Sequence, residues 1–409
     1  MDITRRTLAG TAAALPLLSA TRVRAQSASG AGTAIKLGVL TDLSGPYQDV
    51  AGPVAAKAAQ LALEDYGASA KGLNVEVLVA DHQNKPDIGA GIARQWFDEG
   101  VDLIVEVANS GVALAVAGVV KDKNKVYLNS GAASSDLTGI YCNANTIHWA
   151  YDTYMLSRGT GGALTKAGGD TWFFITADYT FGNALQRDAT EFVTAAGGKV
   201  LGSIKYPFPG TTDFSSVLLQ AQSSGAKVLG LANAGADTVN TIKQAKEFGI
   251  TMTLAGLLLF ISDVHALGLE VAQGIALTDS FYWDMNDRTR AFSERLKPKA
   301  PATRPTMVHA GVYSSVLHYL KTAHEMGAEV KKDGAATIAR MKAMPTEDDC
   351  FGAGTIREDG RKIHPSYLWQ VKTPAESKGP WDYYKPVATT PADQAFRPLG
   401  AGGCNIVKS

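Results

Sequence analysis

Apolar and polar positions follow two alternating patterns from Ala34 onward. Short runs rich in Val, Ile and Leu alternate with longer segments in which apolar residues recur every three or four positions. The short runs are typical of buried strands, and the longer segments are typical of amphipathic helices. Because small-residue loops separate them, the pattern predicts parallel sheets covered by helices on both faces. The first series comprises strands at 35–40, 75–80, 103–107 and 126–129, and helices at 52–66, 88–99 and 112–122.

A second series of the same kind begins after residue 145. Its strands lie at 172–176, 200–206, 228–232 and 252–254, and its helices at 181–196, 213–224 and 236–248. A strand-like run at 275–281 precedes helices at 289–296, 309–326 and 335–344. Asp359-Gly360 predicts the turn of a hairpin, whose partner strand continues as 367–372. The predicted fold class is therefore α/β, with two doubly wound parallel-sheet lobes.

The start of the chain has the order of features found in export signals. Arg5 and Arg6 form a twin-arginine pair, an apolar stretch at 8–20 follows, and small residues lead to Ala25. The stretch is too short to span a bilayer. The sequence predicts a twin-arginine-like export signal over residues 1–25 and a periplasmic location. A disordered basic arm is the alternative.

The composition of the chain restricts the fold and the classes of binding partner that it can have. Hydrophobic residues make up 45% of the chain and charged residues 19%, which suits two buried cores. Removal of residues 1–25 leaves a mildly acidic chain, so the sequence argues against nucleic acid as a partner. No later run approaches the roughly 18 uninterrupted apolar residues that a membrane span requires.

The cysteines and histidines show no close ligand spacing, so the sequence predicts neither a metal site nor a cofactor. It also has no dinucleotide fingerprint, nucleophile elbow or phosphate loop, and we expect no enzyme. An oxidising compartment permits one disulfide among Cys142, Cys350 and Cys404. A Cys142–Cys404 bond would tether the Gly-rich tail, and three reduced, buried thiols are the alternative.

Several segments resemble one family in their order and spacing. They are the run from Ile35 to Tyr47, Ser110 at a helix start, the run from Asn129 to Thr138, the run from Asp178 to Gly182, and Asp359-Gly360-Arg361. Together they resemble type I periplasmic solute-binding proteins of ATP-binding cassette (ABC) importers, in particular the leucine/isoleucine/valine-binding branch. The likeness covers nearly the whole chain after the export signal.

This resemblance implies two lobes joined by three crossing hinge strands, expected near 149–154, 278–283 and 350–354. Lobe 1 would comprise 34–148 plus 284–349, lobe 2 would comprise 149–283 plus 350–372, and 373–409 would be a C-terminal tail packed on the lobes. It further implies a monomer that captures a small solute by lobe closure and delivers it to membrane permease subunits. A ligand-sensing protein for amides or urea-type solutes, or one that serves a receptor, is the alternative.

Ligands of open α/β sheets collect beyond the carboxyl ends of the strands, where helix-start amides favour anions. Ser110 and Ser134 are predicted to donate hydroxyls to a ligand carboxylate, or else to cap the following helices. Gly111, Ala132 and Ala133 would let the backbone approach the ligand.

Other candidates follow the strands of both series. Tyr47, Tyr179 and Phe181 would sandwich the apolar part of a ligand, although Phe181 also suits a helix core. Asn233 offers a donor and an acceptor, or forms a turn. Tyr151 and Trp283 lie on predicted crossings, where rings either line the pocket or pack in the hinge.

The predicted ligand class depends on one departure from the family. Amino-acid-binding relatives carry an acid after the strand that ends here near Gly256, and it pairs the ligand's ammonium. This chain has Leu257, Leu258, Leu259 and Phe260 there, and Leu258 is a candidate lining residue. An apolar wall suits an aromatic or aliphatic acid, or an amide. If the charge comes instead from Asp152, Asp178 or Asp279, a branched-chain amino acid remains an alternative ligand.

Overall fold

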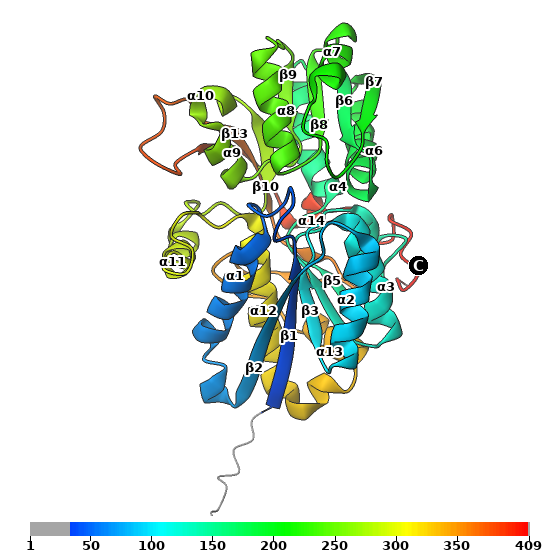
Figure 1. Ribbon diagram of the computed structural model, residues 1–409, viewed down its shortest axis with the longest axis vertical. Coiled ribbons are helices and arrows are strands. Elements are labelled where there is room, and N and C mark those ends of the chain that lie inside the picture. Colours follow the sequence, from blue (N-terminus) through cyan, green and yellow to red (C-terminus); the bar gives the residue numbers. More distant parts are fainter. Residues whose placement is uncertain (1–32, 408–409) are drawn as a thin grey trace, which may run out of the picture. The chain divides into compact units, whose positions relative to one another are not determined.

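The apolar runs of the chain form two sheets (Figure 1). A computed structural model describes residues 33–407, and the predicted export signal lies outside the described residues. The first sheet has five parallel strands in the order β2-β1-β3-β4-β5. Its strands are β1 Thr33–Thr41, β2 Leu73–Asp81, β3 Leu103–Glu106, β4 Val126–Asn129 and β5 Thr146–His148.

Helices cover both faces of the first sheet, as the apolar periodicity predicts. They are α1 Gly52–Tyr66, α2 Pro86–Asp98, α3 Ser110–Asp122, α11 Asp287–Leu296, α12 Met307–Met326 and α13 Gly334–Ala343. The ring of Trp96 in α2 lies against Gly38 of β1, where an added Cβ would be 2.4 Å from two ring carbons. Glycine at this position therefore lets α2 pack closely on the sheet.

The second sheet has seven strands in the order β14-β13-β10-β9-β8-β6-β7. They are β6 Thr171–Ala177, β7 Lys199–Tyr206, β8 Val228–Ala232, β9 Thr253–Gly256, β10 Ala276–Asp279, β13 Ser366–Val371 and β14 Tyr384–Thr390. Strands β6 to β10 run parallel, whereas β13 is antiparallel to β10 and β14 is antiparallel to β13. The predicted fold class is confirmed, with an antiparallel edge that the sequence pattern does not reveal.

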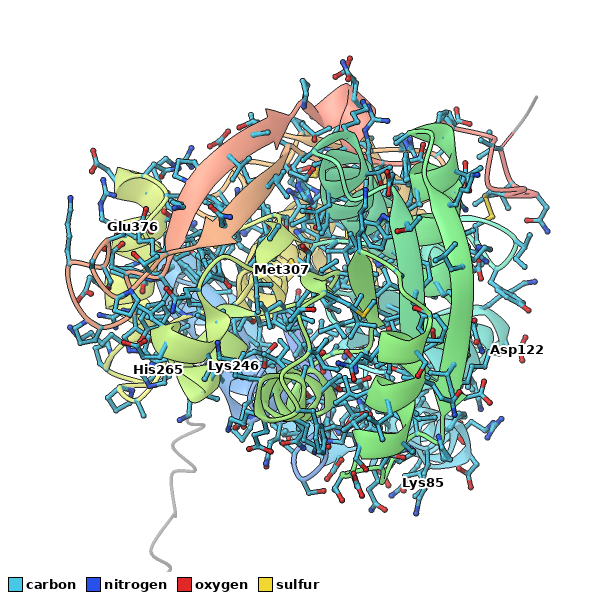
Figure 2. The ribbon with its side chains drawn as sticks, turned by 90° about the horizontal axis from the view of Figure 1, so that it is seen from above. Lys85, Asp122, Lys246, His265, Met307 and Glu376 are labelled. Atoms are coloured by element: carbon cyan, nitrogen blue, oxygen red, sulfur yellow. A yellow bond between two sulfur atoms is a disulfide. The ribbon has the colours of Figure 1, made fainter. Side chains whose placement is uncertain are left out.

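The helices of the second lobe also flank its sheet. They are α4 Thr153–Leu156, α5 Gly162–Lys166, α6 Thr180–Ala195, α7 Ser215–Ser223, α8 Ala236–Glu247, α9 Ile261–Leu267 and α10 Leu269–Ala272. The short helix α14 Ala392–Ala395 follows β14 and lies against β12, between the lobes (Figure 1). Figure 2 places Met307, which is buried at the start of α12, near the centre of the view, and exposed Lys85, Asp122 and Glu376 at its edges. No helix within residues 33–407 has the length and apolar character needed to cross a membrane.

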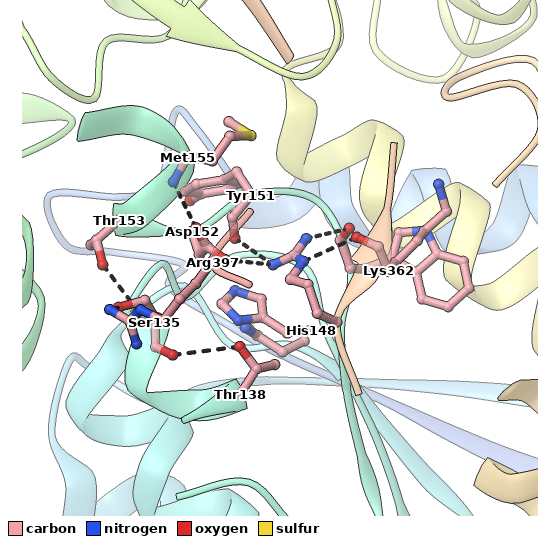
Figure 3. Close-up of polar contacts among 12 residues, drawn as sticks. Ser135, Thr138, His148, Tyr151, Asp152, Thr153, Met155, Lys362 and Arg397 are labelled. Atoms are coloured by element: carbon pink, nitrogen blue, oxygen red, sulfur yellow. Dashed lines mark hydrogen bonds and ion pairs between the residues drawn. The ribbon is translucent and has the colours of Figure 1, made fainter. Parts of the chain in front are cut away.

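Arg361 organises the region where the chain passes between the two sheets. Its guanidinium is fully buried and donates hydrogen bonds to the carbonyl oxygens of Trp149 (2.7 Å), Tyr151 (3.1 Å) and Lys362 (3.0 Å). It also pairs with Asp152 at 3.6 Å, and Asp152 accepts a hydrogen bond from the amide of Met155 (Figure 3). Because a buried charge needs several partners, Arg361 fixes the first and third passages against each other.

The third passage differs from the prediction. The hairpin of β11 Thr355–Ile356 and β12 Lys362–Ile363 is a separate two-stranded sheet that lies against the edge of the first sheet, because Arg361 forms a β-bridge with His148 of β5 and the His148 amide donates to the oxygen of Gly360. The chain therefore crosses after β12, and the passage predicted at 350–354 is wrong. The run at 367–372 does not continue the hairpin, because β13 pairs with β10 and β14 instead.

One part of the predicted C-terminal tail forms a strand, and the other part runs back to the first lobe, where a disulfide holds it. Its β14 forms the edge of the second sheet, whereas Cys404 is joined to Cys142 beside the first sheet by a disulfide. Cys350 is a free, buried thiol. Between these points, Phe396 lies under the Arg361 guanidinium at 4.3 Å, and Arg397 donates to Ser135 (2.9 Å). The tail thus contacts both lobes and the region between them.

Candidate functional site

A small cavity lies between the two lobes. The space in it that the centre of a water molecule can reach is about 10 Å³, so the lobes are nearly closed on each other in the described arrangement. Its lining comes almost entirely from loops at the carboxyl ends of strands, together with the start of α12. The lining residues are Tyr47, Val50, Ala108, Gly131, Ala133, Tyr151, Tyr179, Phe181, Ala234, Leu258, Phe260 and Val308.

The loop after β1 is held by one buried carboxylate. Asp42 accepts hydrogen bonds from the amides of Gly45 (2.7 Å) and Tyr47 (2.8 Å) and from the side-chain amide of Asn84 (2.8 Å). Asp at the first position of a turn commonly folds the chain back on itself in this way. The turn places the Tyr47 ring in the cavity wall.

Aromatic rings from both lobes meet beside the cavity. The Phe208 ring stacks on Tyr179 with centroids 4.2 Å apart and on Tyr47 with centroids 5.6 Å apart. The hydroxyl groups of Tyr47 and Tyr179 hydrogen-bond each other across the two lobes. Burial, and then the neighbouring Tyr179, raises the pKa of Tyr47, so both hydroxyls are neutral hydrogen-bonding groups at physiological pH.

Two residues of the first-lobe wall have backbone amides without a hydrogen-bond partner among the described residues. Among the hydrogen bonds of residues 33–407, none engages the amide N–H of Gly131 or of Ala133, although both residues line the cavity. The Tyr151 hydroxyl donates to the carbonyl oxygen of Gly131 at 2.5 Å and holds this loop in place. Unpaired amides at the edge of an apolar cavity are suited to bind a carboxylate.

Glu106, the last residue of β3, lies directly behind this wall. Its side chain is fully buried, and neither carboxylate oxygen has a hydrogen-bond partner among the described residues. A Cβ atom on Gly131 would be 1.9 Å from Glu106 Oε1, so only glycine fits at position 131. Burial raises the pKa of Glu106 to about 8. The sequence reasoning missed this residue, although an acid within the apolar run Leu103–Glu106 is a detectable signal.

Polar contacts hold the two lobes together around the cavity. The Ala236 amide donates to the carbonyl oxygen of Pro46 at 3.0 Å. Ser135 donates to Asp188 of α6 at 2.7 Å, and Arg187 pairs with Asp136 at 3.0 Å. The described arrangement is therefore one in which the lobes touch on more than one side of the cavity.

The two predicted serines are not at the cavity. Asn109, not Ser110, caps α3, because the Asn109 side chain accepts from the amides of Gly111 (2.9 Å) and Val112 (3.1 Å). The Ser110 hydroxyl is buried and accepts from the amide of Ser134 at 3.1 Å. Ser134 caps the short helix that follows it, because its hydroxyl oxygen accepts a hydrogen bond from the Asp136 amide. This is one of its two predicted roles. The serines thus fix the loops whose neighbours line the cavity.

Other predicted residues also lie elsewhere. The backbone of Ala132 is already paired, because its amide donates to Asn129 and its oxygen accepts from Asn129 and His148. Gly111 faces Thr180 at the contact between α3 and α6. Asn233 is buried and bonds Thr238 (2.7 Å) and Thr241 (3.1 Å) inside the second lobe.

Trp283 lies in a different hollow on the second lobe. Its indole donates to the carbonyl oxygen of Trp381 at 2.9 Å, and the hollow is also lined by Tyr282, Trp369 and Tyr384. Six of the predicted residues do meet at the cavity, four of them aromatic and two small or apolar. They are Tyr47, Ala133, Tyr151, Tyr179, Phe181 and Leu258.

The acids considered as partners for a ligand ammonium are occupied or remote. Asp152 pairs with Arg361, and Asp178 lies about half exposed beside Lys205 at 3.2 Å. Asp279 is buried in the second passage and accepts from the Phe281 amide at 3.0 Å. Burial raises the pKa of Asp279 to about 8. None of the three is a lining residue of the cavity within the described part of the chain.

Five lining residues escaped the sequence reasoning, and a sixth, Phe260, entered it only as part of the apolar run after Gly256. Val50, Ala108, Gly131, Ala234, Phe260 and Val308 complete the wall. Ala108, Gly131 and Ala234 follow strands, so the strand-end rule that found their neighbours applies to them as well. Val308 belongs to α12, and no local pattern marks a helix residue that faces another lobe. No group of three or more His, Cys, Asp or Glu side chains within residues 33–407 is placed to hold a metal ion.

Two α/β lobes that enclose a cavity at the carboxyl ends of their strands define a two-lobed binding protein, and comparisons with known proteins agree. The family model described as periplasmic binding protein matches residues 34–380. The chain therefore belongs to the periplasmic binding protein family, as its sequence predicts.

Similar proteins cover nearly all of the chain. A periplasmic binding protein from Burkholderia mallei is 49% identical, covers 92% of this chain and 100% of its own, and has a TM-score of 0.88. A branched chain amino acid ABC transporter periplasmic ligand-binding protein from Burkholderia xenovorans LB400 is 41% identical, covers 91% of this chain and 99% of its own, and has a TM-score of 0.79. Leu/Ile/Val-binding protein homolog 3 from Brucella melitensis biotype 1 is 25% identical over 83% of this chain and 92% of its own length.

Proposed function

We propose that this protein captures a small carboxylate-bearing solute with an apolar body and delivers it to the permease of an ABC importer. The observation that carries this proposal is the cavity between the lobes, with unpaired amides on one wall and aromatic rings on the others. The ligand's carboxylate binds the amides of Gly131 and Ala133. Its apolar body packs against Phe181, Leu258 and Phe260.

Capture works through closure of the lobes. A ligand that contacts both walls stabilises the closed form relative to the open form, and the shift is as large as its differential affinity for the two. Tyr47 and Tyr179 meet only when the lobes approach, so their hydrogen bond adds to the closed form. The closed lobes then present the surface that the permease recognises.

The importer assignment draws on the relatives. The Burkholderia xenovorans protein is named as part of a branched chain amino acid ABC transporter. We extend to this chain the association with permease subunits, a monomeric state, no enzymatic activity, and export through the twin-arginine route. A branched-chain amino acid and an aromatic or aliphatic acid both satisfy the carboxylate requirement.

Calorimetric titration with benzoate, isovalerate, leucine, acetamide and urea tests the ligand class. We expect one-to-one binding of at least one of the acids and no binding of urea. Tyr179→Ala should weaken that binding at least tenfold, because the ring lines the cavity. Trp283→Phe is the matched control, since Trp283 lies in the other hollow, and it should leave the affinity unchanged. Tight binding of urea with no response to any acid would contradict the proposal.

A further inference from the structure

We propose that Glu106 makes carboxylate capture depend on a retained proton: the cavity binds a monocarboxylate while Glu106 is neutral and releases it when Glu106 ionises. This inference rests on the proposed function, because it concerns the same site. It assigns a role to a residue that lies behind the cavity wall. Glu106 is a positioning residue in this role, since its side chain acts on the ligand through the Gly131 loop.

The geometry places the acid close to the expected ligand carboxylate. Glu106 Oε1 occupies the space that a side chain at Gly131 would fill, 1.9 Å from the Cβ position. Gly131 and Ala108 both line the cavity and both border this space. Glu106 itself is not a lining residue, so a ligand ammonium cannot reach its oxygens while the loop stays in place.

The backbone holds Glu106 in an unusual conformation. Glu106 and Val107 have φ angles of 80° and 65°, in the left-handed region that β-branched residues in particular avoid. Such strain persists where the surrounding structure imposes it, and it clusters at ligand sites. It is observed here at the end of β3, where the chain turns from the sheet toward the cavity.

No cation in the described structure compensates a negative charge at this position. The groups that face Glu106 are the Thr41 hydroxyl and the Asp42 carboxylate from β1 and its loop, Tyr127 from β4, and Tyr151 after β5. Thr41 and two backbone amides lower the pKa of Glu106, yet no donor meets its oxygens at hydrogen-bonding geometry. Burial therefore dominates, and the pKa rises to about 8.

The neutral acid and the ligand carboxylate are compatible, whereas two carboxylates are not. An ionised Glu106 beside the Gly131 amide would place a like charge near the bound anion in a poorly solvated site. Ligand binding therefore favours the protonated form and raises the pKa of Glu106 further. The affinity for the ligand is therefore full below the pKa of Glu106 in the free protein and falls as pH rises through that pKa.

Binding of benzoate and isovalerate, measured by calorimetry between about pH 6 and about pH 10, tests this inference. We expect the wild-type Kd to rise about tenfold per pH unit above the pKa of Glu106. Glu106→Gln should bind within a few fold of wild type near neutral pH and show no alkaline loss. Asp279→Asn removes another buried acid of raised pKa, one that does not line the cavity and does not contact Gly131, and it should behave as wild type.

Proton uptake provides a readout that needs no variant. Titration of the wild type in two buffers of different ionisation enthalpy should show uptake of up to one proton per ligand at alkaline pH. An affinity that does not change with pH, or an alkaline loss that persists in Glu106→Gln, would overturn the inference. Failure of every acid to bind at any pH would instead contradict the proposed function itself.

Discussion

At the scale of single residues, the site depends on groups that are small or unpaired. Gly131 leaves space for the Glu106 carboxyl, lines the cavity, and has an amide without a hydrogen-bond partner among the described residues. The aromatic and apolar candidates followed from their places after strands, and the structure brings Tyr47, Tyr151, Tyr179, Phe181 and Leu258 together. The serine candidates do not line the cavity. A hydroxyl at a helix start can face a ligand or cap the helix, and the sequence pattern does not show which neighbouring residue forms the cap.

Gly131→Ala tests the requirement for this glycine. The added Cβ would clash with Glu106 Oε1 and would lie 2.8 Å from Ala108 Cα, so the loop must shift. We expect a loss of about 1–3 kcal/mol in the free energy of unfolding and at least a tenfold weaker binding of benzoate or isovalerate. Gly118→Ala in α3 is the control, because nothing lies within 4 Å of its Cβ position. Equal behaviour of the two variants in denaturant unfolding would contradict this account.

The hydroxyl pair that links the lobes can be tested with a double-mutant cycle. Tyr47→Phe and Tyr179→Phe each remove one partner of the same hydrogen bond. Each should weaken ligand binding by roughly 0.5–1.5 kcal/mol, and the double variant should be no weaker than either single one. Tyr141→Phe, an exposed tyrosine, serves as control. Additive losses in calorimetry would show that the hydroxyls act separately.

At the scale of elements, local periodicity predicted most helices and strands of both lobes within a few residues. It could not predict β14 or the place of the third passage. The edge strand is stabilised by pairing with β13, and the hairpin at 355–363 is positioned by the bridge from Arg361 to His148. Both contacts join residues far apart in the sequence, and neither leaves a local pattern.

His309, near the start of α12, makes the folding stability depend on pH. His309 Nδ1 accepts from the Thr306 amide at 3.1 Å, and its Nε2–H donates to the Ala51 oxygen at 2.8 Å, which requires the neutral ring. Burial lowers the pKa of His309 to about 4. The unfolded chain, with a pKa of about 6.5, binds the proton first, so this contribution to stability is full above about pH 6.5 and declines as pH falls toward 4.

We therefore expect His309→Asn to unfold with a smaller loss of stability between neutral and acidic pH than the wild type. His324→Asn, exposed on the same helix, should retain the wild-type dependence. Chemical denaturation at a series of pH values provides the comparison. Identical pH profiles for wild type and His309→Asn would show that His309 is not the group responsible.

At the scale of the whole molecule, the C-terminal segment adds a connection between the lobes beyond the three passages. It leaves the second sheet at β14, contacts Arg361 through Phe396, and ends in the Cys142–Cys404 disulfide beside the first sheet. The sequence suggested this cysteine pairing from the position of Cys404 in a Gly-rich segment. It gave no sign that the same segment contributes a strand.

Removal of the disulfide tests how much this segment contributes to stability. The bond closes a loop with a sequence separation of 262 residues, and its loss should lower the free energy of unfolding by roughly 2–5 kcal/mol. Thermal unfolding of Cys142→Ser/Cys404→Ser should show a lowered Tm. A reductant should lower the Tm of the wild type but not that of the double variant. A reductant effect that persists in the double variant would contradict this assignment.

A crystal structure of the protein purified from its own periplasm, with its solute bound, would show whether one small carboxylate occupies the cavity between the lobes. We expect a carboxylate within hydrogen-bonding distance of the Gly131 and Ala133 amides, and an apolar body against Phe181 and Leu258. A solute without a carboxylate in this cavity, or one bound instead in the hollow beside Trp283, would contradict this expectation.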